Sequence, residues 1–576
     1  MIHGTDRRQD ASNGFFGGCG RRVAVAAGWV AAFGAGAGLA ATPVLPERPA
    51  LVVVVAIDQF RGDYLDRFGA YFGAGGFRRL LEHGANFTDC RYRHGITKTA
   101  AGHAVMLTGV HANEHGIINN AWVERGTLKR VNCVEDATVA IVGRPETPGG
   151  VRLPGQTVPM GVSPRRLLAT TVGDELKIAT AGRAKVIGLA NKDRSAVLLA
   201  GKLGDSAYWM DRGLMVTSTH YRVALPPWVA AFNAEGRIDR YFGQVWDRVL
   251  PAEIYDRVQG PDEAEGEAAD YGLGLTFPRR VDGGAATLGT AFYNAFDQVP
   301  FKSEVLMAFA EATVTAENLG GRGVTDLLGL GLSVNDSVGH SYGPDSHEVM
   351  DVTLRTDRML AEFFSFLDRR VGAGRWLAVL TADHGIAPLP ERVKALGAGV
   401  NAGRVDNVRL LKTGEAALDA AFGRLAEGRR WFVIDENSLV LVPVALAERN
   451  VAAAEAERVL AAAIGSLEFV DTAWTRTDLL AGRVHGEWAA ATRLSFHAER
   501  SGDVYFQVAP YWVDRKNGTN HGSPYRYDTH VPLLWMGPGV KPGRRPEPVG
   551  VEDLAPTLAH LLGIPAPPKA QGRVLF

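Results

Sequence analysis

Cysteine is scarce in this chain, with 3 among 576 residues, so no metal site built from several thiolates can form. Cys19 precedes the first apolar run, which leaves Cys90 and Cys133 as a pair that an oxidising compartment would permit to form one disulfide. An excess of one charge is also absent, because the chain has 62 Lys and Arg residues and 63 Asp and Glu residues. A neutral total gives no long-range attraction to nucleic acid, so we expect no nucleic-acid binding and look for a local anion site.

Long apolar runs are absent after residue 41, so nothing beyond the N-terminus is expected to span a membrane. Residues 1–22 are polar and end in Arg21-Arg22, and residues 23–41 are uncharged and rich in Ala and Gly. This pattern predicts a cleavable signal peptide at 1–41, a mature chain of 42–576 and a periplasmic or secreted location. An uncleaved anchor is the alternative, and in either case contact with the membrane would come only through this segment.

Several short apolar runs have the length and β-branched content of strands buried on both faces. They lie at residues 50–57, 185–190, 327–334, 376–381 and 531–536, with helical patterns between several of them. This alternation predicts an α/β fold with a doubly wound, mostly parallel sheet flanked by helices. In such sheets ligands bind beyond the carboxyl ends of the strands, where Asp58, Lys192, Asp336 and Asp383 stand.

Two long stretches do not look like simple connections. Residues 196–322 are rich in Trp, Tyr and Pro, and residues 386–510 contain Ala-rich amphipathic segments. Structureless loops of this length are rare in compact domains. We therefore expect both stretches to be insertions with structure of their own, forming a cap over the strand ends of one catalytic domain at 42–576.

Carboxylates and imidazoles follow these strands in a pattern that suits divalent cations. The candidate ligands are Asp58, Asp336, His340, Asp383, His384 and His521. Two ions, each with about four oxygen or imidazole ligands, can be built from this set, and zinc suits it best. Taken singly, each Asp could instead cap a helix and each His could fill a polar pocket.

The segment from Arg93 to Trp122 carries a candidate nucleophile. Thr99 precedes small residues and a Gly, as at a strand-to-helix turn where a hydroxyl is exposed and backbone N–H groups converge on an anion. Its simplest alternative role is a helix N-cap. Lys192 and Arg194 are separated by one residue and would project the same way to grip phosphoryl oxygens, unless they are a solvated surface pair. Asn120 would add a neutral donor.

Together these motifs resemble the alkaline phosphatase superfamily, in the branch of nucleotide pyrophosphatase/phosphodiesterases and threonine-dependent, PafA-like bacterial alkaline phosphatases. The resemblance is carried, in order, by VVVAIDQFRGDYL, TKTAAGHAVMLTG, HGIINNAW, NKDRSAVLLAG, DSVGHSYGP, TADHG and NHGSPYRYDTHVPLLWMGPG. It implies one zinc held by Asp336, His340 and His521. It implies a second zinc held by Asp58, Asp383 and His384, with Thr99 between the two ions as nucleophile and metal ligand.

The resemblance also implies the reaction. Asn120, Lys192 and Arg194 look like the substrate-binding residues of the monoesterases, which predicts hydrolysis of small-molecule phosphate monoesters through a phosphothreonine intermediate. A phosphodiesterase or nucleotide pyrophosphatase with the same nucleophile and metals is the alternative enzyme. A secreted zinc-binding protein without activity is the alternative outside catalysis.

Overall fold

The structure is a computed structural model that describes residues 48–144, 161–397 and 399–576. The signal peptide predicted at residues 1–41 lies outside this range. The described residues form one compact unit. Among the described residues, no helix is both long and apolar enough to cross a bilayer.

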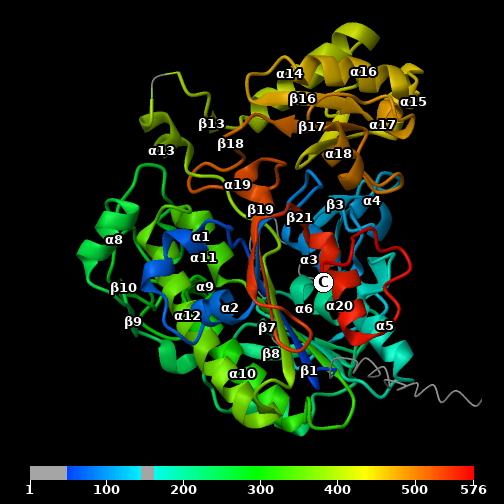
Figure 1. The fold of residues 1–576 in the computed structure, drawn as a ribbon. Coiled ribbons are helices and arrows are strands. Elements are labelled where there is room, and N and C mark those ends of the chain that lie inside the picture. The colour runs from blue at the N-terminus through cyan, green and yellow to red at the C-terminus, as the bar shows by residue number, and fades with distance from the viewer. Residues whose placement is uncertain (1–47, 145–160, 398) are drawn as a thin grey trace, which may run out of the picture. The chain divides into compact units, whose positions relative to one another are not determined.

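A central sheet of eleven strands organises the described chain (Figure 1). In spatial order the strands are β20 (Gly543–Arg545), β2 (Ala85–Arg91), β19 (His530–Met536), β12 (Trp376–Thr381), β1 (Leu51–Ile57), β11 (Asp326–Leu332), β6 (Val186–Ala190), β7 (Ser206–Asp211), β8 (Leu214–Ser218) and β5 (Ile141–Val142), with β21 (Val549–Gly550) also paired to β2. The strands from β12 to β7 pair in parallel, whereas β19 and β8 run antiparallel to their neighbours. All five strands expected from the apolar runs are therefore present in one mostly parallel sheet.

The apolar composition of the middle strands explains why they lie at the centre of the sheet. Every residue of β1, β11 and β12 is buried, as a parallel sheet covered on both faces requires. Figure 1 shows helices on the two faces. One face carries α3 (Thr99–Thr108), α5 (Val172–Ala179), α6 (Asp193–Ala200) and α20 (Leu554–Leu562), and the other carries α2 (Phe77–His83), α10 (Phe301–Ala316), α11 (Val334–Tyr342) and α12 (His347–Leu367). The predicted doubly wound α/β fold is confirmed.

The stretch expected as a second insertion contains its own small sheet and core. Its antiparallel strands are, in spatial order, β14 (Phe432–Asp435), β15 (Ser438–Leu441), β17 (Val504–Val508) and β16 (Val470–Thr475). Its helices are α14 (Asn407–Phe422), α15 (Pro443–Arg449), α16 (Ala453–Ile464), α17 (Arg476–Leu480) and α18 (Ala489–Ser495). Leu410, Trp431 and Leu460 are fully buried in the core between them. Figure 1 shows these elements in yellow and orange.

The stretch expected as a first insertion is joined more closely to the main sheet, because it supplies β7 and β8. It also contains α7 (Pro227–Ala234), β9 (Val245–Trp246), α8 (Ala252–Gln259), β10 (Arg279–Arg280), α9 (Thr290–Phe296) and α10. The shorter remaining elements are α1 (Tyr64–Arg67), α4 (Ala112–His115), β3 (Ala121–Val123), β4 (Arg130–Asn132), α13 (Pro390–Ala395), β13 (Gly403–Arg404), β18 (Trp512–Val513) and α19 (Arg526–Thr529). The limits of the two insertions and of the catalytic domain stay predictions.

The disulfide that the sequence permits does not form. Cys90 lies on β2 and Cys133 follows β4, and both thiols are free and buried. Burial raises the pKa of Cys133 to about 12, so this thiol is protonated at neutral pH. The two cysteines act as small apolar residues of the interior.

Candidate active site

Three carboxylates meet where the central strands end. Asp58 directly follows β1, Asp383 follows β12, and Asp336 lies in the first turn of α11, just after β11. Asp58 and Asp383 are fully buried, and Asp336 is nearly so. Because burying a carboxylate is costly unless it is paired, three of them at one place indicate a site for cations.

The donor atoms form two groups, each with atoms within 4.8 Å of one another. One group is Asp58, Asp383 and His384, which matches one of the expected ligand sets. The other is Asp336, His384 and His521. His340, expected with Asp336 and His521, lies just outside this closest group, with its Nε2 3.3 Å from Asp336 Oδ1. His384 therefore stands between the two groups.

The three histidine rings are oriented by backbone carbonyls. Nδ1 of His340 lies 2.9 Å from the oxygen of Thr519, and Nδ1 of His521 lies 2.7 Å from that of Thr97. Nδ1 of His384 is similarly 2.9 Å from its neighbour's carbonyl oxygen. A carbonyl only accepts hydrogen bonds, so each Nδ1 carries the proton and each Nε2 offers a lone pair toward the carboxylates.

The pKa values of two of these carboxylates, Asp58 and Asp336, shift in opposite directions. Burial, together with the charges of Asp336 and Asp383, holds the pKa of Asp58 well above its usual range. Burial would also raise the pKa of Asp336, but the ammonium of Lys192 outweighs it and holds that pKa well below its usual range. Burial lowers the pKa of His521, so its ring is neutral and able to bind a metal.

The residues present fit divalent cations. Oδ1 of Asp58 and Nε2 of His384 are buried without a hydrogen-bond partner among the described residues, although they lie only 3.5 Å apart. Buried polar atoms normally have a partner, and a cation between these two atoms would satisfy both. Carboxylate and imidazole donors suit zinc and other borderline divalent ions.

Thr99 begins α3 at the same end of the sheet. Lys98 is the N-cap of that helix, so the simpler expectation that Thr99 caps it is wrong. The helix approaches the carboxylates closely, because a Cβ added at Gly102 would lie 2.2 Å from the carbonyl oxygen of Asp383. The small residues after Thr99 thus bring its helix against the backbone of a candidate metal ligand.

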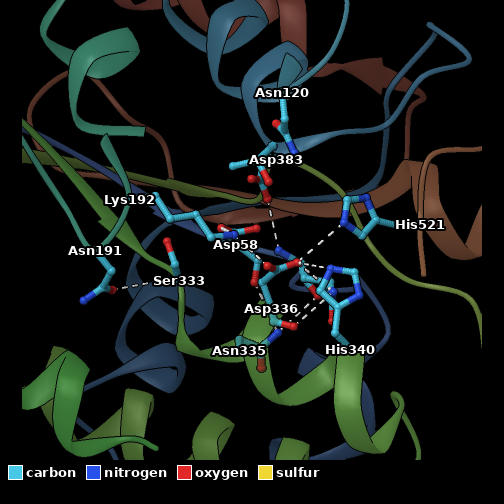
Figure 2. A network of polar contacts seen from close by, with 12 residues as sticks. Asp58, Asn120, Asn191, Lys192, Ser333, Asn335, Asp336, His340, Asp383 and His521 are labelled. Carbon is cyan, nitrogen blue, oxygen red and sulfur yellow. Dashed lines mark hydrogen bonds and ion pairs between the residues drawn. The ribbon is translucent and has the colours of Figure 1, made fainter. Parts of the chain in front are cut away.

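Two of the three expected substrate-binding residues contact other parts of the site: Asn120 contacts the start of α3, and Lys192 contacts the candidate metal ligands. Oδ1 of Asn120 accepts a hydrogen bond of 2.8 Å from the backbone N–H of Ala100. Nζ of Lys192 lies 2.5 Å from Asp58 Oδ2 and 2.6 Å from Asp336 Oδ2, and Figure 2 shows the three side chains pointing toward one another. Arg194 does not share these carboxylates, since its nearest acidic partner is Asp193 at 3.9 Å.

Two neighbours missed in the sequence complete the site. Gln59 donates from Nε2 to Asp336 Oδ1 at 2.8 Å and from its backbone N–H to Asp383 Oδ1 at 3.0 Å. Nδ1 of His103 lies 2.9 Å from the carbonyl oxygen of Thr99 and 3.1 Å from Asp383 Oδ2. The sequence signal for Gln59 was its position directly after Asp58. The signal for His103 was its four-residue spacing from Thr99, which places it one helical turn further along α3.

Two cavities adjoin the site. One of about 480 Å³ is lined by Asn120, Lys192 and Arg194, together with Trp209 and Lys302. The other, of about 250 Å³, has a mixed polar and apolar lining that includes Lys98, Glu436, Phe506, Trp512 and His521. Each cavity is thus lined by at least one of the expected site residues.

Comparison with known proteins shows the family to which the chain belongs. The sequence pattern of the type I phosphodiesterase / nucleotide pyrophosphatase family matches residues 52–530. The alkaline phosphatase PhoV of Synechococcus elongatus is 36% identical, over 92% of this chain and 93% of PhoV. A protein of Myroides odoratus named calcium-transporting ATPase is 34% identical, over 90% of this chain and 93% of that protein.

A third relative has a known structure. The alkaline phosphatase PafA of Elizabethkingia meningoseptica is 31% identical, over 91% of this chain and 94% of PafA. The crystal structure of PafA superposes with a TM-score of 0.82 over 92% of this chain and 98% of PafA. This chain is a hydrolase that belongs to the type I phosphodiesterase / nucleotide pyrophosphatase family, among the relatives of the alkaline phosphatases PhoV and PafA.

Proposed function

We propose that this protein is a periplasmic or secreted alkaline phosphatase that hydrolyses phosphate monoesters through a phosphothreonine on Thr99, at a site holding two zinc ions. The observation that carries the proposal is that the backbone at and just before Thr99 contacts side chains associated with both ligand groups. His103 bridges the carbonyl oxygen of Thr99 and the carboxylate of Asp383. On the other side, the carbonyl of Thr97 accepts a hydrogen bond from His521. The export signal predicted at 1–41 supports the location.

The residue types substituted in one relative support the same assignment. A solved variant of PafA carries substitutions at a threonine, an asparagine, a lysine and an arginine. This chain has the same four types in the same order at Thr99, Asn120, Lys192 and Arg194. Asp336, His340 and His521 would hold one zinc ion, and Asp58, Asp383 and His384 the other, with Thr99 as an additional ligand between them.

The proposed reaction has two displacements at phosphorus. The Thr99 oxygen forms a bond to phosphorus as the ester oxygen of the leaving group departs, and a water molecule later displaces the Thr99 oxygen and releases inorganic phosphate. The proton lost by Thr99 and the proton gained by the leaving group balance through solvent. When bound, zinc would supply positive charge that favours the deprotonated forms of the reacting oxygens.

The cations of the site favour a monoester. Its phosphoryl group carries two negative charges, which remain on the nonbridging oxygens in a loose transition state. Lys192, Arg194 and Asn120 line one cavity, where they would neutralise or hydrogen-bond those oxygens. A diester has one such charge and therefore gains less from the same pair of cations.

A phosphodiesterase is the second candidate, and the size of that cavity favours it. At about 480 Å³ it has room for the second substituent of a diester beside Lys192 and Arg194. The ratio of monoester to diester hydrolysis separates the two enzymes. A zinc-binding protein without activity, the third alternative, predicts hydrolysis of neither substrate.

Trapping of the phosphoenzyme tests the proposal. Zinc-loaded protein is mixed with an aryl phosphate monoester and quenched in acid, and the phosphorylated residue is located by mass spectrometry. We expect phosphate on Thr99, its absence in Thr99→Ala, and a loss of activity in that variant of roughly a thousandfold or more. Thr99→Ser should keep a hydroxyl and much of the activity. Thr108→Ala is the control, because this hydroxyl donates to Ala104 within the same helix; full activity of Thr99→Ala would overturn the proposal.

A further inference from the structure

Glu436 occupies the two-residue turn between β14 and β15, in the second stretch expected as an insertion. Asp435 pairs with Ser438 across this turn. The backbone φ of Glu436 is +53°, in the left-handed region that favours Gly and Asn and is uncommon for a glutamate. A residue held in such a conformation points to a role for its side chain.

The Glu436 carboxylate contacts the segment that carries Thr99 and the segment that carries Asn120. Its Oε2 lies 3.3 Å from Nζ of Lys98 and accepts a hydrogen bond of 3.1 Å from Nδ2 of Asn119. Its Oε1 accepts one of 3.2 Å from Arg130. Lys98 directly precedes the proposed nucleophile, and Asn119 directly precedes the proposed phosphate-binding asparagine.

The contact with Asn119 continues to the start of α3. Oδ1 of Asn119 accepts a hydrogen bond of 2.7 Å from the backbone N–H of Asn120. Oδ1 of Asn120 in turn accepts one of 2.8 Å from the N–H of Ala100, the residue after Thr99. This leaves Nδ2 of Asn120 as its donor for a ligand. Glu436 is therefore linked to both sides of Thr99, through Lys98 and through the two asparagines.

The charges of this cluster are balanced. Burial would raise the pKa of Glu436, but Lys98 and Arg130 outweigh it and lower that pKa, so the side chain is a carboxylate at neutral pH. Arg130 also pairs with the neighbouring Asp435 at 2.8 Å, and Asp435 accepts a hydrogen bond of 2.9 Å from the backbone of Val123. The turn is thus fixed on both sides of Glu436, which limits the freedom of its side chain.

We infer that Glu436 is a positioning residue that holds Asn120 in place for phosphoryl transfer, contributed by a segment remote in sequence from the catalytic motifs. The inference rests on the proposed function. Glu436 acts through Asn119 and Asn120 and needs no contact with substrate. Its loss would leave the carboxamide of Asn120 less well oriented toward the phosphoryl oxygens.

Glu436→Gly is the decisive variant, because glycine relieves the left-handed backbone while removing the carboxylate. We expect kcat/KM for an aryl phosphate monoester to fall about tenfold while the melting temperature stays near that of the wild type. Glu436→Gln still accepts a hydrogen bond from Asn119, so it should recover most of the activity. Glu448→Ala is the matched control: it breaks an ion pair with Arg429 in the same segment and should leave activity unchanged.

A double-mutant cycle shows whether Glu436 acts through Asn120. In the Asn120→Ala background, Glu436→Gly should lower kcat/KM by less than about twofold, because the group it positions has gone. A full tenfold loss in that background, or unchanged activity of the single variant, would overturn the inference. If Asn120→Ala and Thr99→Ala were themselves fully active, the proposed function would fail first, so the two failures are distinguishable.

Discussion

Nζ of Lys192 lies 2.5 Å from Oδ2 of Asp58, so a residue expected to bind phosphate contacts a residue expected to bind metal. The same ammonium is 2.6 Å from Asp336 Oδ2. These charges outweigh the effect of burial and raise the pKa of Lys192, so its ammonium stays charged. Lys192 thus provides the counter-charge to carboxylates of both ligand groups.

Removal of Lys192 should change substrate preference. We expect Lys192→Ala to lower kcat/KM for an aryl monoester by roughly a hundredfold, and for the matching diester by much less, because the monoester dianion depends more on this charge. Lys302→Ala is the control, since Lys302 lines the same cavity but is paired with Asp297 at 2.6 Å. Equal losses for both substrates would mean that Lys192 does not recognise the phosphoryl charge.

The shared position of His384 predicts the metal content of variants. Zinc-loaded wild-type protein should contain two ions per chain by elemental mass spectrometry, a readout independent of activity. His384→Ala should lose the ion assigned to the Asp58 group and should bind the other ion less tightly, because His384 belongs to both close groups of donors. His340→Ala should keep the ion of the Asp58 group. A wild-type content of two ions in His384→Ala would contradict the ligand assignment.

The opposite pKa shifts of two carboxylates predict opposite effects on the stability of the metal-free protein. The folded-state pKa of Asp58 is raised, so its ionisation destabilises the fold as pH rises through that pKa, and Asp58→Asn should raise the melting temperature at neutral pH. The pKa of Asp336 is lowered, so its charge stabilises the fold above the unfolded pKa, and Asp336→Asn should lower the melting temperature.

The difference in melting temperature between each variant and the wild type should shrink in acid, where both carboxyl groups are protonated in the wild type as well. Thermal melts of chelator-treated protein between neutral and acidic pH measure them. Stabilisation or destabilisation by both variants alike would show that the two carboxylates do not differ as the structure implies.

Gly102 should be intolerant of a side chain. A Cβ there would lie 2.2 Å from the carbonyl oxygen of Asp383, so Gly102→Ala must push α3 away from the ligands. We expect a loss of about 1–3 kcal/mol in the free energy of unfolding and a lower kcat. Gly69→Ala is the comparison, because nothing lies within 4 Å of its added Cβ. Wild-type kcat and stability in Gly102→Ala would contradict the close packing of Thr99's helix.

The parts of the fold that follow from local sequence were predictable. The run LVVVVAI becomes the fully buried β1, and the polar residue after it, Asp58, lies at the carboxyl end of the sheet as expected. These features depend on composition and on the general rule for ligand sites in parallel sheets. The convergence of Asp58 with Asp336 follows from the same rule, because β1 and β11 are adjacent and parallel.

Contacts between distant segments were not predictable. Glu436 lies more than 300 residues from Lys98 and carries no periodic or motif signal, so its ion pair appears only once the chain is folded. Cys90 and Cys133 were paired only by elimination, and their burial in separate places could not be read from spacing. Lys192 was placed with Arg194 by alternation, but a buried pair of carboxylates attracts the ammonium more strongly.

The most direct test of the central claim is the ratio of kcat/KM for an aryl phosphate monoester to that for the matching diester, measured on purified, zinc-loaded protein. We expect a strong preference for the monoester, because Lys192, Arg194 and Asn120 line the cavity proposed to receive the phosphoryl group. A preference for the diester would contradict it and would identify the protein as a phosphodiesterase.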